Sequence, residues 1–215
     1  MRYKGLIFDF DYTLGDSTEG IVASVNYALE KLGYAAAERE AVRSTIGLHL
    51  EETYRVLVPE GNEAEAAEFA RLFIEKADQV MTEHTQFFPG VLALLKKWKN
   101  QGRKLAIVTT KYHYRIDAIL EKYQVNHLID VIVGGDDVKH PKPDPEGLFQ
   151  VLHIWDMSKE EVLYVGDSVV DAKTAQAASV DFAGVTTGAT AKADLEAYPN
   201  VGVFTGIEEL QFKNA

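Results

Sequence analysis

The sequence predicts an α/β protein with a doubly wound parallel sheet and a mostly helical domain inserted after the first strand. Short apolar runs rich in β-branched and aromatic residues recur along the chain, and helical patterns separate the later ones. Strands that are apolar on both faces are typical of parallel sheets covered by helices, and repeated βα units indicate a doubly wound sheet. About ninety residues separate the first two runs, where one crossover helix would suffice.

The elements of the sheet domain follow in order along the chain. The expected strands are residues 4–10, 104–109, 129–133, 162–165 and 181–185. The expected helices are residues 91–98, 112–123, 145–155 and 169–178. The sheet therefore has a helix available for each crossover between consecutive strands.

The inserted segment has helical patterns and apolar faces of its own. Helices are expected over residues 17–32, 50–57 and 63–83, the first with Ser17 or Thr18 as its N-cap and Gly33 as its stop signal. We therefore expect an α/β catalytic core formed by residues 1–14 and 87–215, and a helical cap domain formed by residues 15–86.

Composition excludes several classes of function. The 33 acidic and 22 basic residues give a net charge of −11, which argues against a nucleic-acid surface and means that an anionic substrate needs a local cation. The absence of cysteine excludes disulfides, thiolate catalysis and cysteine-ligated zinc. Early charges argue against a secretory signal, and no apolar run approaches the ~20 residues of a membrane span. We expect a cytoplasmic monomer or homodimer with no membrane or nucleic-acid partner.

Polar residues gather where the expected strands end. Carboxyl ends of parallel strands meet at one edge, which here receives Asp9, Asp11, Thr109, Thr110, Lys111, Lys142, Asp167 and Asp171. Any one of the aspartates could simply cap a helix. Together they would repel by several kcal/mol per close pair, so a cation is expected among them. Oxygen ligands without soft or imidazole partners favour Mg²⁺.

Two other metal sites fit the sequence poorly. A calcium loop of the EF-hand type beginning at Asp9 needs glycine at its sixth position and glutamate at its twelfth, where this chain has Leu14 and Gly20. The six histidines are scattered without the spacing of a zinc site.

Phosphoryl transfer is the chemistry that this set of residues suits. A strand-end carboxylate beside Mg²⁺ is a plausible nucleophile towards phosphorus. A second carboxylate two residues later lies on the same side of an extended strand, where it could protonate the leaving oxygen and then activate water. A threonine hydroxyl and a lysine ammonium could hold the other phosphate oxygens.

The same residues resemble the four motifs of the haloacid dehalogenase superfamily. The motif DxDx[TV]L corresponds to residues 9–14, the strand-end threonine to Thr109, the loop lysine to Lys142, and GDxxxD to residues 166–171. The insertion between the first two motifs is similar to the helical cap of the phosphoglycolate-phosphatase and β-phosphoglucomutase-like branch. The resemblance covers the chain from end to end.

The resemblance implies a role for each residue. Asp9 would form an aspartyl phosphate, and Asp11 would act as general acid and base with its backbone carbonyl on Mg²⁺. Asp9, Asp11 and Asp167 would be the metal ligands, and Asp171 would hold either a metal-bound water or Lys142. Thr109, Thr110 and Lys142 would bind the phosphoryl group of a small phosphorylated metabolite. The cap would close over the substrate and exclude water.

Several alternatives remain open beside a phosphatase. A β-phosphoglucomutase-like mutase is disfavoured because the arginine expected after a cap glycine is missing from residues 46–52, and Asp11 argues against a dehalogenase or a phosphonatase. A receiver-type signalling domain has no place for the long insertion. Lys111 could contact a distal charge on the substrate or be a solvated helix-start lysine. Tyr12 stands where the family usually has glycine, so it must adopt ordinary dihedrals or be tolerated at a cost.

Overall fold

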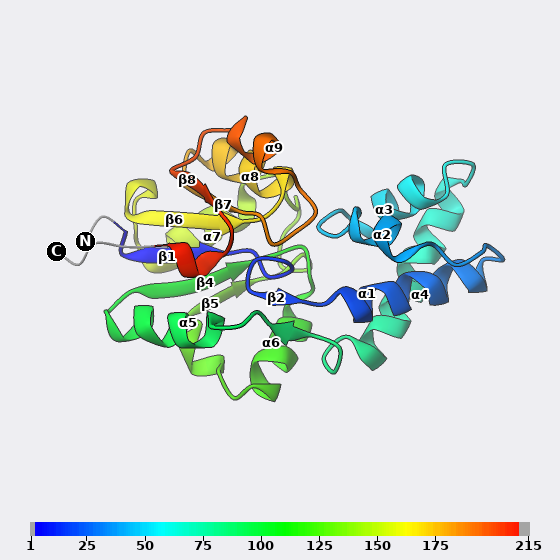
Figure 1. The fold of residues 1–215 in the computed structure, drawn as a ribbon, viewed down its shortest axis with the longest axis horizontal. Coiled ribbons are helices and arrows are strands. Elements are labelled where there is room, and N and C mark those ends of the chain that lie inside the picture. The colour runs from blue at the N-terminus through cyan, green and yellow to red at the C-terminus, as the bar shows by residue number, and fades with distance from the viewer. Residues whose placement is uncertain (1–2, 211–215) are drawn as a thin grey trace. The chain divides into compact units, whose positions relative to one another are not determined.

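The computed structural model describes residues 3–210, and the chain divides into two compact units. The larger unit combines Met1–Gly15 with Phe87–Ala215, and the smaller unit is Asp16–Gln86. Figure 1 shows a sheet with helices in the larger unit and helices in the smaller one. Among the described residues, none of the helices has both the length and the apolar character that a membrane crossing requires.

A six-stranded parallel sheet lies at the centre of the larger unit within the described residues. Its strands are β1 (Gly5–Phe8), β4 (Lys104–Val108), β5 (Val131–Val133), β6 (Val162–Gly166), β7 (Asp181–Val185) and β8 (Gly202–Phe204), in the spatial order β5-β4-β1-β6-β7-β8. Numbered along the sheet-forming strands alone, this is the 3-2-1-4-5-6 order of a doubly wound fold. The chain leaves β1 towards one edge and later returns beside it at β6, so β1 and β6 flank the switch point. The predicted fold class is confirmed.

Alternating side chains of the strands enter two apolar cores on opposite faces of this sheet. Leu6 and Phe8 of β1 belong to one core, whereas Ile7 belongs to the other. The first core is covered by α5 (Val91–Asn100) and α6 (His113–Lys122), and the second by α7 (Glu146–Trp155), α8 (Val169–Ala178) and α9 (Lys192–Glu196). Burial on both faces explains the uninterrupted apolar runs of the strands.

The first strand is shorter than the pattern predicts. It ends at Phe8, so the expectation that residues 9 and 10 continue it is wrong. The backbone N–H groups of Thr13, Leu14 and Gly15 all donate to the carbonyl oxygen of Phe10, at 3.2, 2.9 and 3.1 Å. This tight turn takes the chain out of the sheet ladder directly after Asp9. The prediction also missed β8, because its three residues form no apolar run long enough to recognise.

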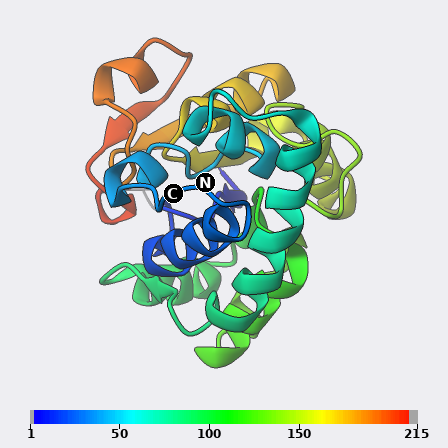
Figure 2. The same ribbon diagram turned by 90° about the vertical axis from the view of Figure 1, so that its right-hand side faces the viewer.

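The smaller unit is helical and has its own apolar core. Its helices are α1 (Thr18–Lys31), α2 (Arg39–Arg43), α3 (Leu50–Leu57) and α4 (Glu63–Val80). Figures 1 and 2 show α1 and α4 side by side, and their apolar faces meet around Val25, Phe69 and Phe73. Asn62 and Glu65 form a capping box at the start of α4.

Local signals set the boundaries of α1. The side chain of Asp16 accepts a hydrogen bond from the Thr18 N–H at 2.8 Å, and Gly33 ends the helix with a φ of 87°. The chain passes between the units at β2 (Gly15–Asp16) and β3 (Gln86–Phe87), which form a two-stranded sheet.

Candidate active site

Asp9 and Asp167 follow the two strands that flank the switch point. The strands are in register, with Phe8 opposite Val165, and the Asp9 N–H donates to the Val165 carbonyl oxygen at 2.9 Å. Both aspartates are 5% exposed. Carboxylate oxygens of Asp9, Asp167 and Asp171 lie within 4.8 Å of one another, so three like charges share one buried volume.

Asp171 reaches this volume from the first turn of α8. Ser168 is the N-cap of that helix and forms a capping box with Asp171: the Asp171 N–H donates to Ser168 Oγ at 3.1 Å, and the Ser168 N–H donates to Asp171 Oδ2 at 3.1 Å. A Cβ on Gly166 would lie 2.5 Å from the Asp171 side chain, so glycine is needed where β6 ends. Local helix capping therefore orients this carboxylate.

Lys142 is buried between two of the aspartates. Its Nζ donates to Asp9 Oδ1 at 2.9 Å, to Asp171 Oδ1 at 2.7 Å and to the hydroxyl oxygen of Tyr164 at 3.2 Å. The structure therefore brings Lys142 together with Asp9 and Asp171, which the chain separates by 133 and 29 residues. The contact with Lys142 is one of the two that the sequence analysis named for Asp171.

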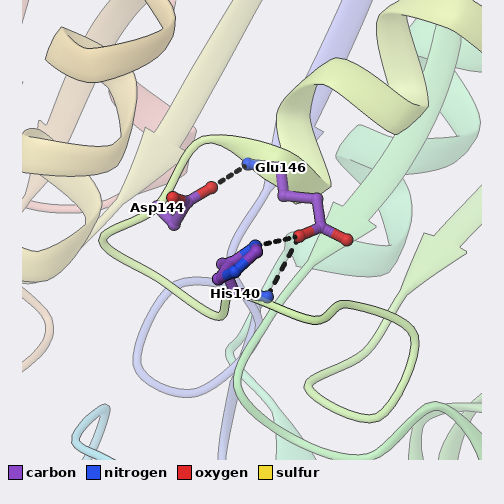
Figure 3. A group of neighbouring side chains, drawn as sticks. All are labelled: His140, Asp144 and Glu146. Atoms are coloured by element: carbon purple, nitrogen blue, oxygen red, sulfur yellow. Dashed lines mark hydrogen bonds and ion pairs between the residues drawn. The ribbon is translucent and has the colours of Figure 1, made fainter.

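The loop that carries Lys142 is held by side chains at its two ends (Figure 3). The Glu146 carboxylate accepts hydrogen bonds from the backbone N–H groups of Lys139 and His140, each at 3.0 Å. It also lies 3.0 Å from His140 Nδ1, and Figure 3 shows both contacts with His140. Asp144 Oδ1 accepts from the Glu146 N–H at 3.0 Å. These contacts close the loop on the start of α7, and Lys142 lies between its tied ends.

Burial and like charges raise the pKa values of two carboxyl groups. Burial, and after it the charges of Asp171 and Asp9, raises the pKa of Asp167 well above its usual value. Burial also raises the pKa of Asp9 to about 6, although the Lys142 ammonium pulls it down. A positive charge placed beside these two carboxyl groups would lower both pKa values and favour their ionised forms.

Asp171 and Lys142 stabilise each other's charged forms. Burial alone would raise the pKa of Asp171, but the Lys142 ammonium and the hydrogen bonds from Lys142, Ser168 and Tyr164 outweigh it and leave this pKa below its usual value. Burial would lower the pKa of Lys142, but Asp171 and Asp9 raise it well above its usual value. The Asp171–Lys142 pair is therefore a fixed charge pair beside Asp9.

Asp11 lies close enough to this group of carboxylates for its charge to contribute to the raised pKa of Asp9. Its Oδ2 lies 3.1 Å from Lys111 Nζ. Lys111 is thus buried and ion-paired, so of its two alternatives the solvated lysine is wrong, and contact with a distal charge of the substrate stays a prediction. Within residues 3–210, the buried Oδ1 atom of Asp11 has no hydrogen-bond partner and is therefore an open acceptor.

Tyr12 adopts the left-handed conformation, with a φ of 59°. The expectation of ordinary dihedrals is therefore wrong, and the alternative, a tolerated cost, holds. The Thr187 hydroxyl donates to the Tyr12 carbonyl oxygen, and the Thr13 hydroxyl donates to Asp167 Oδ1 at 3.3 Å. The loop after β7 thus secures the turn that carries the first motif.

The same loop also approaches Asp167 directly. A Cβ on Gly188 would lie 1.9 Å from Asp167 Oδ2, so a larger residue would displace the carboxylate. The sequence analysis did not find Gly188 or Tyr164, because a glycine after a strand and a tyrosine within an apolar strand are ordinary features. The two-residue spacing of Tyr164 and Gly166, which puts both on one face of β6, is the available signal.

The end of β4 supplies the two predicted threonines. Thr109 is buried and lines a small cavity together with Lys142, Gly134 and His140. Its hydroxyl oxygen accepts from the Lys111 N–H at 3.3 Å. Thr110 follows and is half-buried, with its carbonyl oxygen against Gly135. The structure thus brings Thr109 and Lys142 to one cavity.

Comparisons with known proteins agree with this geometry. The sequence profile of the family described as haloacid dehalogenase-like hydrolase matches residues 6–185. A phosphoglycolate phosphatase of Cereibacter sphaeroides is 34% identical over 96% of this chain and 95% of its own length. The pyrophosphatase PpaX of Bacillus cereus is 32% identical over 92% of this chain and 90% of its own length.

One solved structure is similar to this chain in both sequence and fold. This protein of Bacteroides fragilis is described as a haloacid dehalogenase-like hydrolase. It matches with a TM-score of 0.93 and 40% identity over 97% of this chain and all of its own. The chain therefore belongs to the haloacid dehalogenase-like hydrolase family, and the named relatives that it matches over nearly their whole length are phosphatases.

Proposed function

We propose that this protein is a Mg²⁺-dependent phosphatase that hydrolyses a small phosphate monoester, phosphoglycolate or a similar compound, through an aspartyl phosphate on Asp9. The observation that carries the proposal is the position of Asp9. Its carboxylate is buried at the switch point, 2.9 Å from the Lys142 ammonium and close to Asp167. The names of the relatives support the substrate class.

The donor atoms fit Mg²⁺. The neighbouring carboxylates of Asp9 and Asp167 supply only oxygen. Burial and the charges of nearby carboxylates, Asp171 first, raise both pKa values, so a divalent cation would stabilise their ionised forms. Asp171 is less suited to direct ligation, because both of its oxygens already accept hydrogen bonds. When bound, Mg²⁺ would neutralise charge on the phosphoryl oxygens and on the two carboxylates.

The chain's own residues perform the two chemical steps. Asp9 attacks phosphorus, so that a bond forms between its carboxylate oxygen and phosphorus while the bond to the ester oxygen breaks. Asp11 donates a proton to that departing oxygen and then removes a proton from the water that attacks the aspartyl phosphate. Thr109, Thr110 and Lys142 hold the remaining phosphoryl oxygens. The second step releases inorganic phosphate and regenerates Asp9.

Phosphate release tests the proposal. With a generic aryl phosphate we expect turnover in Mg²⁺ and loss of turnover in a chelator, restored when Mg²⁺ is added back. A panel of phosphoglycolate, pyrophosphate, sugar phosphates and nucleoside monophosphates, scored by kcat/KM, would then identify the substrate. Assaying free phosphate and sugar-phosphate isomers together separates hydrolysis from a mutase. Transfer between sugar positions without free phosphate would refute the hydrolase.

The stabilisation of the protein by Mg²⁺ should grow as the pH rises. The Asp9 pKa is about 6 in the folded chain against 3.8 ordinarily, so the metal-free protein retains a proton that the unfolded chain releases. Its free energy of unfolding should therefore fall between about pH 4 and pH 6, by up to about 3 kcal/mol from this group. Mg²⁺ binds the ionised carboxylates and should oppose that fall.

Thermal unfolding with chelator and with saturating Mg²⁺, at about pH 4 and about pH 7, measures this effect. The difference in Tm between chelator and Mg²⁺ at each pH reports on the site, because surface carboxylates titrate equally in both conditions. Asp9→Asn should lose the part of this pH dependence that Asp9 contributes and keep the part that comes from Asp167. An equal Mg²⁺ shift in Tm at both pH values would contradict the assignment of Asp9 as a ligand.

A further inference from the structure

The hydroxyl group of Tyr164 lies inside the polar network of the site. Tyr164 is a fully buried residue of β6, on the sheet face covered by α7 and α8. Its hydroxyl donates to Asp171 Oδ1 at 2.8 Å and accepts from Lys142 Nζ at 3.2 Å, and it lies 3.2 Å from the carbonyl oxygen of Val108. One hydroxyl thus contacts β4, α8 and the lysine loop.

The chemistry of the phenol suits a fixed donor and acceptor. Burial, followed by the charge of Asp171, raises the pKa of Tyr164 well above its usual value, so the group keeps its hydrogen. A hydroxyl has a single hydrogen to donate, and the Asp171 carboxylate is the closer and charged acceptor. Its lone pairs remain directed at Lys142. The hydroxyl therefore connects the two members of the charge pair that lies beside Asp9.

Packing alone accounts for the ring of Tyr164 but not for its hydroxyl. The ring belongs to the apolar core and lies 6.4 Å from the ring of Phe182. Phenylalanine would serve that purpose without placing an extra polar atom in a buried position, which is costly unless the atom is hydrogen-bonded. Here every described contact of the hydroxyl is with a polar atom of the site or of the end of β4.

We propose that Tyr164 is a positioning residue, whose hydroxyl orients the Lys142 ammonium and the Asp171 carboxylate so that Lys142 faces Asp9 Oδ1. The expected effect on catalysis rests on the proposed function. The positioning of Lys142 and Asp171 rests on the hydrogen bonds alone. Tyr164 does not touch the reacting atoms, and it acts through Lys142.

Tyr164→Phe tests the proposal, because it removes only the hydroxyl. We expect kcat for the aryl phosphate to fall about 10- to 100-fold, since reacting groups misplaced by a fraction of an ångström lose rate steeply. KM and the Mg²⁺ concentration for half activity should stay within about twofold. Tyr3→Phe is the matched control. It removes a buried tyrosine hydroxyl that donates to Asp181 at 2.7 Å, at the opposite edge of the same sheet, and it should leave kcat unchanged.

A second background shows whether Tyr164 acts through Lys142. In Lys142→Met, adding Tyr164→Phe should change the residual kcat by less than about twofold, because the group being positioned is already gone. An equal loss in both backgrounds would overturn the inference, as would a Tyr164→Phe enzyme that matches Tyr3→Phe in kcat.

Crystal structures of Tyr164→Phe and of the parent protein separate this inference from the proposed function. The Lys142 Nζ to Asp9 Oδ1 distance, 2.9 Å here, should lengthen by about 0.5 Å or more in the variant. If no substrate releases phosphate, the proposed function fails and this distance still decides the role of Tyr164. If the parent is active while kcat and the distance are unchanged in the variant, the positioning role alone fails.

Discussion

Asp9→Asn is expected to lower kcat by at least about 10⁴-fold, because an amide cannot serve as the oxygen nucleophile that becomes phosphorylated. The substitution preserves the shape of the side chain and its place beside Lys142, so KM should change much less than kcat. Phosphate release under saturating substrate measures the loss. A rapid acid quench with labelled substrate should trap a base-labile phosphoprotein in the parent and none in the variant.

Asp194→Asn is a suitable control for this experiment. It makes the same chemical change at an exposed position of α9, far along the chain from every motif, and should keep full activity. Undiminished turnover in Asp9→Asn, or labelling at the same level as the parent, would remove Asp9 from the mechanism and with it the aspartyl phosphate.

Lys142→Met is expected to reduce both activity and stability. The ammonium is the described basic partner of Asp9 and Asp171, so its removal leaves two buried carboxylates without their counter-charge. Breaking a buried ion pair in this way costs about 3–5 kcal/mol. We also expect kcat/KM to fall about 10²- to 10³-fold, since one charged donor to the phosphoryl group is lost. Thermal unfolding and steady-state kinetics measure the two effects.

Lys139→Met provides a matched comparison within the same loop. It removes the same charge from an exposed side chain three residues away. The backbone N–H of Lys139, which donates a hydrogen bond to the Glu146 carboxylate, remains. This variant should retain the Tm and kcat/KM of the parent. If the two lysine variants behave alike, the loss comes from net charge or loop structure and not from the buried ammonium. Saturating Mg²⁺ should recover part of the stability of Lys142→Met, because a cation near Asp9 replaces some of the missing charge.

The arrangement of the sheet was predictable from the sequence because its strands are covered on both faces. Runs such as residues 162–165 therefore show no polar alternation, and each is followed by a helical pattern. The three-residue strand β8 carries no such signal and was missed. Asp9 and Asp167 were predictable for a related reason: parallel strands end at one edge, and the residues that follow them must meet there.

Contacts within the site depended on turns and pairs that spacing does not encode. The chain bends at Phe10, and Asp11 forms an ion pair with Lys111, a partner that the spacing of the residues does not identify. Tyr12 takes a left-handed conformation that its residue type disfavours, and Thr187, 175 residues away, bonds its carbonyl. No local pattern predicts such a contact.

The sequence by itself determined the α/β class, the helical insertion and the set of strand-end residues, because hydrophobic periodicity and strand polarity depend on local order alone. Tertiary structure alone decided that Asp171 pairs with Lys142, that the Tyr164 hydroxyl joins them, and that Gly188 leaves room for Asp167. Each of these depends on how closely separate segments approach, and a difference of one ångström there decides between a hydrogen bond, an ion pair and a steric clash.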